Sequence, residues 1–312
     1  MAGIQHLCLI TLLLMVMPAF GDQTSGSDVV RTASPPGRGL TEDDFPRVQQ
    51  ISPAVYTFEA LTGPPDDRYT TNSMFVVTDD GVLVADGQGN VEDTGRLVIE
   101  ISKITNQPIS HVVICSDHGD HTKGNSAFPD SAEFIAHINS VATLTTAAET
   151  GGVMPDAVIG DRLDLTIGNR EIRILFLGRA HTGGDLFVYL PAEKILFTSE
   201  VFLNHMFSGY RTSYPREWID TMNRAEEIDA SILIPGHGFI DDARILAEEW
   251  VEYKNHLQVV LDEVTRLHTD GWSVGEAIER AEFGKYAEWS GAGSQGPIGI
   301  RRIYADLNGE LQ

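Results

Sequence analysis

Short apolar segments that end beside a histidine or a carboxylate are the feature that most constrains this chain of 312 residues. Four predicted strands end in this way: Ser110–Cys115 before Asp-His-Gly-Asp-His at 117–121, Ile172–Leu177 before His181, Lys194–Thr198 before Glu200, and Ile232–Ile234 before His237. The loops that follow strands are where a layered α/β fold gathers its functional groups. We therefore expect the four strand ends to meet at one site.

The residue types at these strand ends predict the chemistry of the site. Imidazoles and carboxylates are the ligands that Zn²⁺ and related ions take in sites that activate water. The candidate metal ligands are His118, Asp120, His121, His181, Glu200 and His237. Each of them alone is typical of a turn or a solvated surface, but their recurrence at four strand ends favours a metal centre.

The remaining candidate residues are predicted to be structural. His111 and His137 are interpreted as strand packing residues, His205 as a loop residue, and His256 and His268 as residues on helix surfaces. Cys115, at a strand end, is predicted to be a buried structural thiol rather than a nucleophile. The glycine-rich stretch 291–296 matches a dinucleotide-binding loop in its letters only, because no strand–helix–strand unit surrounds it, and we expect a flexible loop there.

The charge balance excludes two classes of partner. The chain has 22 basic against 45 acidic side chains, a formal net charge of −23, and 42% of its residues are hydrophobic. Nucleic acids and anionic lipids are bound by clustered cations, so neither is an expected partner. A small-molecule substrate is expected instead, and the sequence leaves the oligomeric state open.

The N-terminus predicts export. The apolar run 7–17 is followed by small residues at Ala19 and Gly21, as in a secretory signal, so residues 1–21 are predicted to be removed. Cleavage takes away Cys8 and leaves Cys115 as the single cysteine, with no disulfide within the chain. No later segment is apolar enough to anchor the chain in a membrane. We expect a secreted or periplasmic protein.

The rest of the chain predicts a layered α/β body. Residues 22–47 are rich in Gly, Ser, Thr and Pro and are predicted to be a flexible linker. Residues 48–242 alternate short strands with helices, as expected for sheets covered by helices, and residues 243–312 are predicted to be a helical C-terminal extension. Predicted helices cover Val91–Thr105, Ser140–Glu149, Trp218–Ile228 and Ala243–Leu267.

The order of the motifs resembles the metallo-β-lactamase superfamily over roughly Val55 to Asp242. The family signature is His-x-His-x-Asp-His, then a distant His, a distant Asp and a final Gly-His; this chain has Ser116-x-His118-x-Asp120-His121, His181, Glu200 and Gly236-His237. The resemblance implies a four-layer αββα sandwich and a metal-dependent hydrolase. It does not specify the substrate, because the family cleaves lactams, thioesters, lactones, phosphoesters and sulfate esters.

Two departures from the signature bear on the metals. Ser116 replaces the first His; its hydroxyl is a poor ligand and is at most a candidate substitute, while Asp117 is expected to point away. Glu200 replaces the bridging Asp and is one methylene longer. We expect one tightly held zinc ion at Asp120, His121 and His237 and a weaker one between His118, His181 and Glu200, with iron and manganese as open alternatives.

The resemblance also assigns roles. Asp120 would be catalytic, as the residue that orients the attacking water. Asp86 and Asp185 are candidate partners of the imidazole N–H groups. His205 and Arg211 follow Glu200 in the chain and are candidate pocket residues. Three functions stay open: a metal-dependent hydrolase, a redox or sulfur-chemistry enzyme of the same fold, and a degenerate binding protein without turnover.

Overall fold

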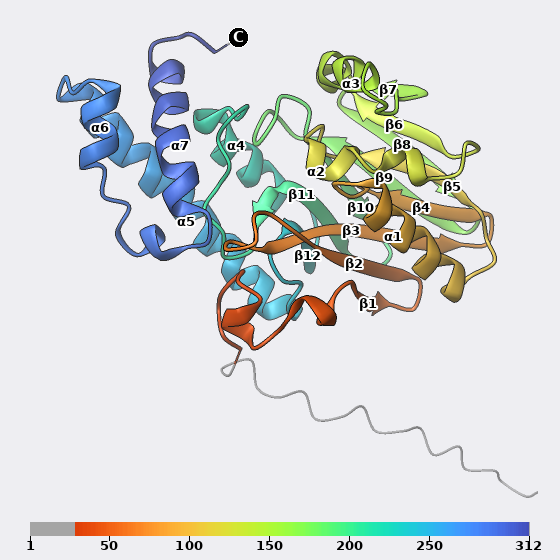
Figure 1. Ribbon diagram of the computed structural model, residues 1–312. Coiled ribbons are helices and arrows are strands. Elements are labelled where there is room, and N and C mark those ends of the chain that lie inside the picture. Colours follow the sequence, from red (N-terminus) through yellow and green to blue (C-terminus); the bar gives the residue numbers. More distant parts are fainter. Residues whose placement is uncertain (1–28, 312) are drawn as a thin grey trace, which may run out of the picture.

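Within residues 29–311, one twelve-stranded β-sheet folds over so that its two halves pack face to face, with helices on their outer faces (Figure 1). These halves are called the first and the second sheet below. The computed structural model describes residues 29–311. The predicted signal at 1–21 lies outside the described residues. The four-layer arrangement implied by the resemblance is confirmed, and so is the helical C-terminal extension.

Each sheet has its own set of strands and covering helices. The first sheet contains β1 (Arg47–Ser52), β2 (Val55–Thr62), β3 (Tyr69–Thr78), β4 (Gly81–Ala85), β5 (Ile109–Ile114), β6 (Glu133–His137) and β7 (Ala157–Ile159), with α1 (Val91–Ile104) and α3 (Val141–Ala148). The second contains β8 (Arg162–Ile167), β9 (Arg170–Phe176), β10 (Leu186–Leu190), β11 (Ile195–Leu203) and β12 (Ile232–His237), with α4 (Pro215–Glu226) and α5 (Ala243–Thr269). Short helical turns are η1 (Pro36–Arg38), η2 (Glu42–Asp44), α2 (Gly119–Thr122), η3 (Asn125–Ala127) and η4 (Ile138–Ser140).

The sheets meet where β3 pairs with β12. The pairing joins His237 at the end of β12 to Thr71 in β3. The parallel strands β4, β5 and β6 end toward the same edge, because parallel neighbours share one direction. The predicted ligands therefore collect at one edge of the sandwich.

Apolar burial on both faces explains why these strands form. All five residues of β4 are buried, as expected for a parallel strand covered on both sides. One face of the first sheet packs on α1 through Leu97 and Ile101, and the other face packs on the second sheet, which contributes the paired Val188 and Phe197. Helix α1 begins where the Asn90 side chain accepts a hydrogen bond from the backbone N–H of Asp93.

The C-terminal extension consists of α5, α6 (Val274–Arg280), η5 (Gly284–Glu288) and α7 (Ala292–Leu307). The prediction of a flexible loop at 291–296 is wrong, because Gly291 caps α7 and the following residues are helical. Tight packing along α7 explains the difference: a Cβ built on Gly296 would lie 3.2 Å from the ring of Phe283, and one built on Gly299 would lie 2.8 Å from the ring of Tyr210. Glycine lets this helix approach the body closely enough to offset its weak helix propensity.

The flexible linker predicted for 22–47 is corrected by the structure over residues 29–47. Ala33 is fully buried, and β1 already begins at Arg47. Arg38 donates two hydrogen bonds to the carboxylate of Asp241, at 2.6 and 2.9 Å. Ion pairs and apolar contacts with the C-terminal half therefore hold this segment against the body.

His256 is also corrected, since we predicted a helix-surface residue. It lies on the buried side of α5, with its ring centroid 4.6 Å from that of Phe207 and 5.1 Å from that of Trp289. Burial lowers the pKa of His256 to about 3, so the ring is neutral and packs as an aromatic residue.

Candidate metal centre

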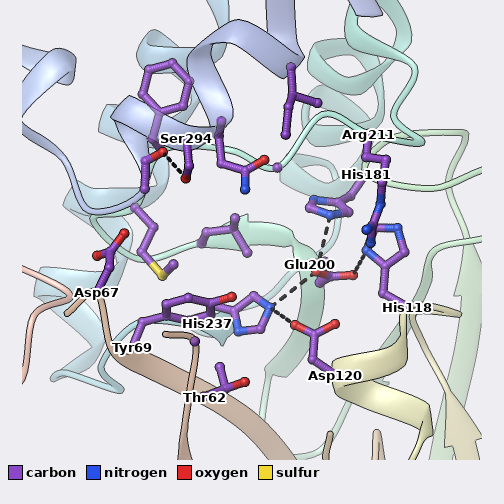
Figure 2. A pocket seen from close by; sticks show the side chains of 18 of the residues that line it. Thr62, Asp67, Tyr69, His118, Asp120, His181, Glu200, Arg211, His237 and Ser294 are labelled. Atoms are coloured by element: carbon purple, nitrogen blue, oxygen red, sulfur yellow. Dashed lines mark hydrogen bonds and ion pairs between the residues drawn. The ribbon is translucent and has the colours of Figure 1, made fainter. Parts of the chain in front are cut away.

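Four separate elements bring the predicted ligands together (Figure 2). His118 precedes the one-turn helix α2, which carries Asp120 and His121. His181 lies in the loop between β9 and β10, and His237 ends β12. Figure 2 shows Glu200 in the middle, between His237 and Asp120 on one side and His118 and His181 on the other.

Glu200 occupies an unusual backbone position. We predicted that it follows the end of a strand, but β11 continues through it to Leu203. The pairing of β11 with β12 is interrupted around Ser199, whose φ is +46°. A Cβ on the neighbouring Gly236 would lie 2.4 Å from the Ser199 carbonyl carbon, so only glycine fits there. At this irregularity the side chain of Glu200 is buried and lies between the histidines on its two sides (Figure 2).

Two imidazoles in the first half of the site present nitrogen atoms to each other. The Nε2 atoms of His121 and His237 are 3.2 Å apart. His237 Nδ1 lies 2.8 Å from the carbonyl oxygen of Thr70, which only accepts, so the proton is on Nδ1. His121 Nδ1 lies 3.1 Å from Asp86 Oδ2, whose charge favours a proton there as well. Both Nε2 atoms therefore face the centre of the site, where a cation can replace the protons that they carry without metal.

Carboxylates complete this first half. Asp120 Oδ2 lies 3.2 Å from His237 Nε2, and Glu200 Oε1 lies 3.3 Å from the same atom. These groups, with His121, place one ligand atom each within 4.8 Å of one another. Two imidazoles and two carboxylates are a donor set suited to zinc and to other divalent ions.

The second half shares Glu200 and adds two further imidazoles. His118 Nδ1 lies 2.9 Å from Glu200 Oε2, and His181 Nε2 lies 3.2 Å from Glu200 Oε1. These three residues form a second group of convergent ligand atoms. The grouping matches the two metal positions predicted from the sequence, with Glu200 common to both.

Ser116, the candidate substitute ligand, contacts Glu200. Its buried hydroxyl donates a short hydrogen bond to Glu200 Oε2. Ser116 thus orients the carboxylate that the two halves share. The neighbouring Asp117 faces away, as expected; its carboxylate interacts with Ser140 and Thr143, and burial raises its pKa.

Opposite charges set the protonation of the site. Burial alone would lower the pKa values of His118 and His237, but nearby carboxylates outweigh it and raise them to about 9 and about 10. Burial would raise the pKa of Glu200, but His181 and His118 hold it well below its usual range. The pKa of His181 falls to about 3 because burial dominates. Without a metal, protons on imidazoles neutralise the carboxylates, and a cation fits the same place.

The two predicted supporting aspartates differ. Asp86 has φ +61° and lies beside His121; its Oδ1 also accepts the backbone N–H of Cys115 at 2.7 Å. Asp185 instead accepts both the backbone N–H and the hydroxyl of Thr182, each at 2.7 Å. Asp185 therefore shapes the loop that carries His181, while Asp86 holds a ligand ring directly.

A cavity of about 440 Å³ opens over both halves. Arg211 lines it, as expected. His205 does not: it pairs with Glu249 at 3.1 Å outside this cavity, because a φ of +58° turns the backbone there. The lining residues that sequence reasoning missed include Tyr69, Ser294, Gln295 and Ile298.

The missed residues come from two sources. Tyr69 begins β3 and places its ring edge against His237, with ring centroids 5.2 Å apart. Ser294, Gln295 and Ile298 belong to α7, far along the chain from every motif. No local signal in the sequence links α7 to the site, because only the packing of the extension brings it there.

Two layered sheets with convergent histidines and carboxylates at one edge define a metal-binding αββα protein. The sequence profile of the metallo-beta-lactamase superfamily matches residues 66–237, which is more than half of the chain. The chain belongs to this superfamily.

Curated relatives are distant. The chain is 26% identical over 140 residues to the alpha subunit of 2,4-dinitroanisole O-demethylase from Nocardioides sp. (strain JS1661), covering 44% of this chain and 42% of that protein. It is 19% identical over 256 residues to a linear primary-alkylsulfatase from Pseudomonas sp. (strain ATCC 19151), covering 65% and 48%. The matched part is thus less than half the length of either relative.

Solved structures confirm the fold. A metallo-beta-lactamase from Pontibacter korlensis superposes with a TM-score of 0.59 at 22% identity, covering 66% of this chain and 98% of that one. The metallo-beta-lactamase IND-7 gives a TM-score of 0.56 at 20% identity, covering 65% and 97%. Within residues 29–311, no helix has the length and apolar character needed to cross a membrane.

Proposed function

We propose that this chain is an exported, metal-dependent hydrolase that cleaves a small ester, lactone, lactam or related electrophile. Membership of the superfamily supports the reaction class. The apolar segment and small residues before position 22 support export to the periplasm or the medium. Zinc is the proposed metal, since imidazole-rich sites with carboxylates suit it.

The convergence of four imidazoles on two buried carboxylates carries this proposal. Nδ1 of His237 is hydrogen-bonded to Thr70 O and Nδ1 of His121 lies beside the Asp86 carboxylate, so among the described residues their Nε2 atoms face each other and the acidic groups. A buried arrangement of this kind is costly unless positive charge occupies it. His118, His181, His121, His237, Asp120 and Glu200 would hold the metal.

The residues around the centre would perform defined steps. A divalent cation, when bound, supplies Lewis-acid chemistry that makes water more acidic and the substrate more electrophilic. The pKa of Asp120 is held below its usual range by its neighbouring histidines despite burial, so its carboxylate is charged. Asp120 would orient the attacking water through a hydrogen bond and accept its proton as the oxygen attacks. The oxygen of that water bonds to the electrophilic centre, the bond to the leaving group breaks, and Asp120 passes the proton to the leaving group.

Substrate binding would use the cavity walls. Burial and the nearby carboxylates Asp120 and Glu200 raise the pKa of Tyr69, so its hydroxyl keeps its proton and can donate a hydrogen bond. Met206 and Ile298 offer apolar surface, and Arg211 lies exposed at the same cavity, where it can pair with an anionic group.

The test is turnover by the purified protein on a panel of lactams, lactones, thioesters, phosphate esters and sulfate esters, each with and without a chelator. We expect hydrolysis of at least one ester-like class that the chelator abolishes and zinc restores. No turnover of any substrate by the zinc-loaded protein would instead support a binding protein without activity. Iron as the only bound metal in the purified protein would support redox chemistry.

A further inference from the structure

Helix α7 holds the loop that follows Glu200 in the chain. This loop, residues 204–214, connects β11 to α4. Arg302 of α7 donates hydrogen bonds to two successive carbonyls, from Nε to Ser213 O at 2.6 Å and from Nη2 to Thr212 O at 3.0 Å. At the other end of the loop, the backbone N–H of Phe207 donates to Ser290 O at 2.9 Å. The extension therefore fixes the loop at two points.

The hydroxyl of Thr212 connects this loop to a predicted metal ligand. Thr212 Oγ1 lies 2.6 Å from His118 Nε2 and 3.4 Å from the carbonyl oxygen of His181. Because a carbonyl only accepts, the hydroxyl proton points toward His181 O. The hydroxyl oxygen then accepts a hydrogen bond from Nε2–H of His118. The ring is held with Nδ1 toward Glu200 Oε2, 2.9 Å away.

We propose that Thr212 and Arg302 are positioning residues of the metal centre: Thr212 keeps the proton of His118 on Nε2, which leaves Nδ1 for the metal, and Arg302 keeps Thr212 in place. This inference rests on the metal centre proposed above. It assigns the C-terminal extension a part in the site, although the superfamily match ends at residue 237. The hydrogen-bond partner of the distal nitrogen fixes which nitrogen of a ligand histidine is free.

The first test removes the Thr212 hydroxyl with little change in volume. Zinc affinities of the wild type, Thr212→Val and Thr212→Ser are measured by competition with a chromophoric chelator, using zinc ions alone as the probe. We expect Thr212→Val to weaken the second zinc equivalent by about 10- to 100-fold and to leave the first unchanged. Thr212→Ser keeps the hydroxyl and should restore the affinity. Thr269→Val, an exposed threonine on α5, is the matched control.

The second test reads the tautomer directly. In ¹⁵N NMR spectra of the zinc-loaded wild type, His118 should carry its proton on Nε2. In zinc-loaded Thr212→Val this signal should broaden or shift, while the signals of His121 and His237 stay in place. Arg302→Met should give a smaller change of the same kind, and Arg301→Met, at an exposed arginine on the same helix, should give none.

The outcomes separate this inference from the function on which it rests. If the wild type binds two zinc ions and Thr212→Val does so with the same affinities, the positioning role is overturned and the metal centre stands. A His118 proton on Nδ1 in the zinc-loaded protein also overturns it. If the wild type binds no zinc at the group containing His118, both this inference and the proposed two-metal arrangement fail.

Discussion

The two halves of the metal centre share Glu200 but differ in how firmly their other ligands are held. In the first half, Nδ1 of His237 faces Thr70 O at 2.8 Å, and Nδ1 of His121 forms no hydrogen bond but lies 3.1 Å from the carboxylate of Asp86. In the second half, Thr212 holds His118 through Nε2, but His181 Nδ1 is buried with neither a hydrogen bond nor an ion pair among the described residues. Ser116 stands where the family has a further histidine.

The second half of the site therefore has fewer ligands, and within the part of the chain that the structure describes, Nδ1 of its ligand His181 has no partner that holds the ring in place. The first half offers four candidate ligands and the second offers three, one of them shared. Replacing a residue that orients a ligand typically weakens metal binding by about 10- to 100-fold. We therefore expect the two metal positions to differ in affinity, with the tighter ion at Asp120, His121 and His237. The substitutions below should change this difference in affinity, from the largest expected effect to the smallest.

Glu200→Gln should have the largest effect because Glu200 belongs to both halves. Replacing the shared carboxylate by an amide removes its negative charge from both positions, and hydrolysis should fall by more than the roughly 100-fold typical of a supporting residue. Metal content and turnover are measured on the same samples. Glu248→Gln, at an exposed position, is the control. Two metals bound with unchanged affinity in Glu200→Gln would refute the shared role.

Asp120→Ala should affect the first half selectively. The variant loses a ligand of that half and the proposed acceptor of the water proton, so metal content should drop by about one ion per chain and turnover should be lost. Elemental analysis and the substrate panel measure the two effects. Asp130→Ala, an exposed turn residue, should behave as the wild type. An unchanged metal content in Asp120→Ala would contradict the assignment.

Ser116→Ala tests whether the serine orients Glu200. The variant leaves Glu200 Oε2 without its buried hydroxyl donor, and a hydrogen bond to a charged group contributes about 1.5–3 kcal/mol, or roughly 10- to 100-fold in affinity. We expect the second metal to weaken more than the first. Zinc titration measures both, with exposed Ser131→Ala as the reference. Equal weakening at the two positions would show that Ser116 does not distinguish them.

Proton release on metal binding should be the smallest effect, and protons should be released from a histidine in each half of the site. The raised pKa values of His237, about 10, and His118, about 9, mean that both rings are protonated at pH 7.5 without metal. Zinc must displace these protons, so its affinity should rise with pH up to about pH 9 and level off above pH 10. Calorimetry in buffers of different ionisation enthalpy counts the protons released. Zinc binding without proton release would contradict these protonation states.

Much of the site could be predicted from the sequence, because its ligands follow strands with clear apolar patterns. His118, Asp120, His121 and His237 lie next to turn residues that follow predicted strands, and their order along the chain is that of the αββα superfamily. The bulge that places Glu200 inside β11 was not predictable, since it depends on the contact between Ser199 and Gly236. Nor was the burial of His256 or the arrival of Gln295 at the cavity, because both result from packing of the extension rather than from local pattern.

Two further strands were absent from the sequence prediction for different reasons. β8 was predictable, because Leu163, Leu165 and Ile167 alternate with polar residues as in a half-buried strand. β7 has only three residues, too few for a periodic pattern. The linker interpretation of 22–47 failed over 29–47 because ion pairs between distant residues, such as Arg38 and Asp241, leave no mark in composition.

The metal content of the purified chain, measured together with hydrolysis before and after chelation, tests the central claim most directly. The account predicts zinc bound in at least one equivalent per chain, hydrolysis of one ester-like class, loss of both on chelation, and recovery of both when zinc is returned. Hydrolysis that persists in metal-free protein, or zinc-loaded protein that cleaves nothing on the panel, would contradict it.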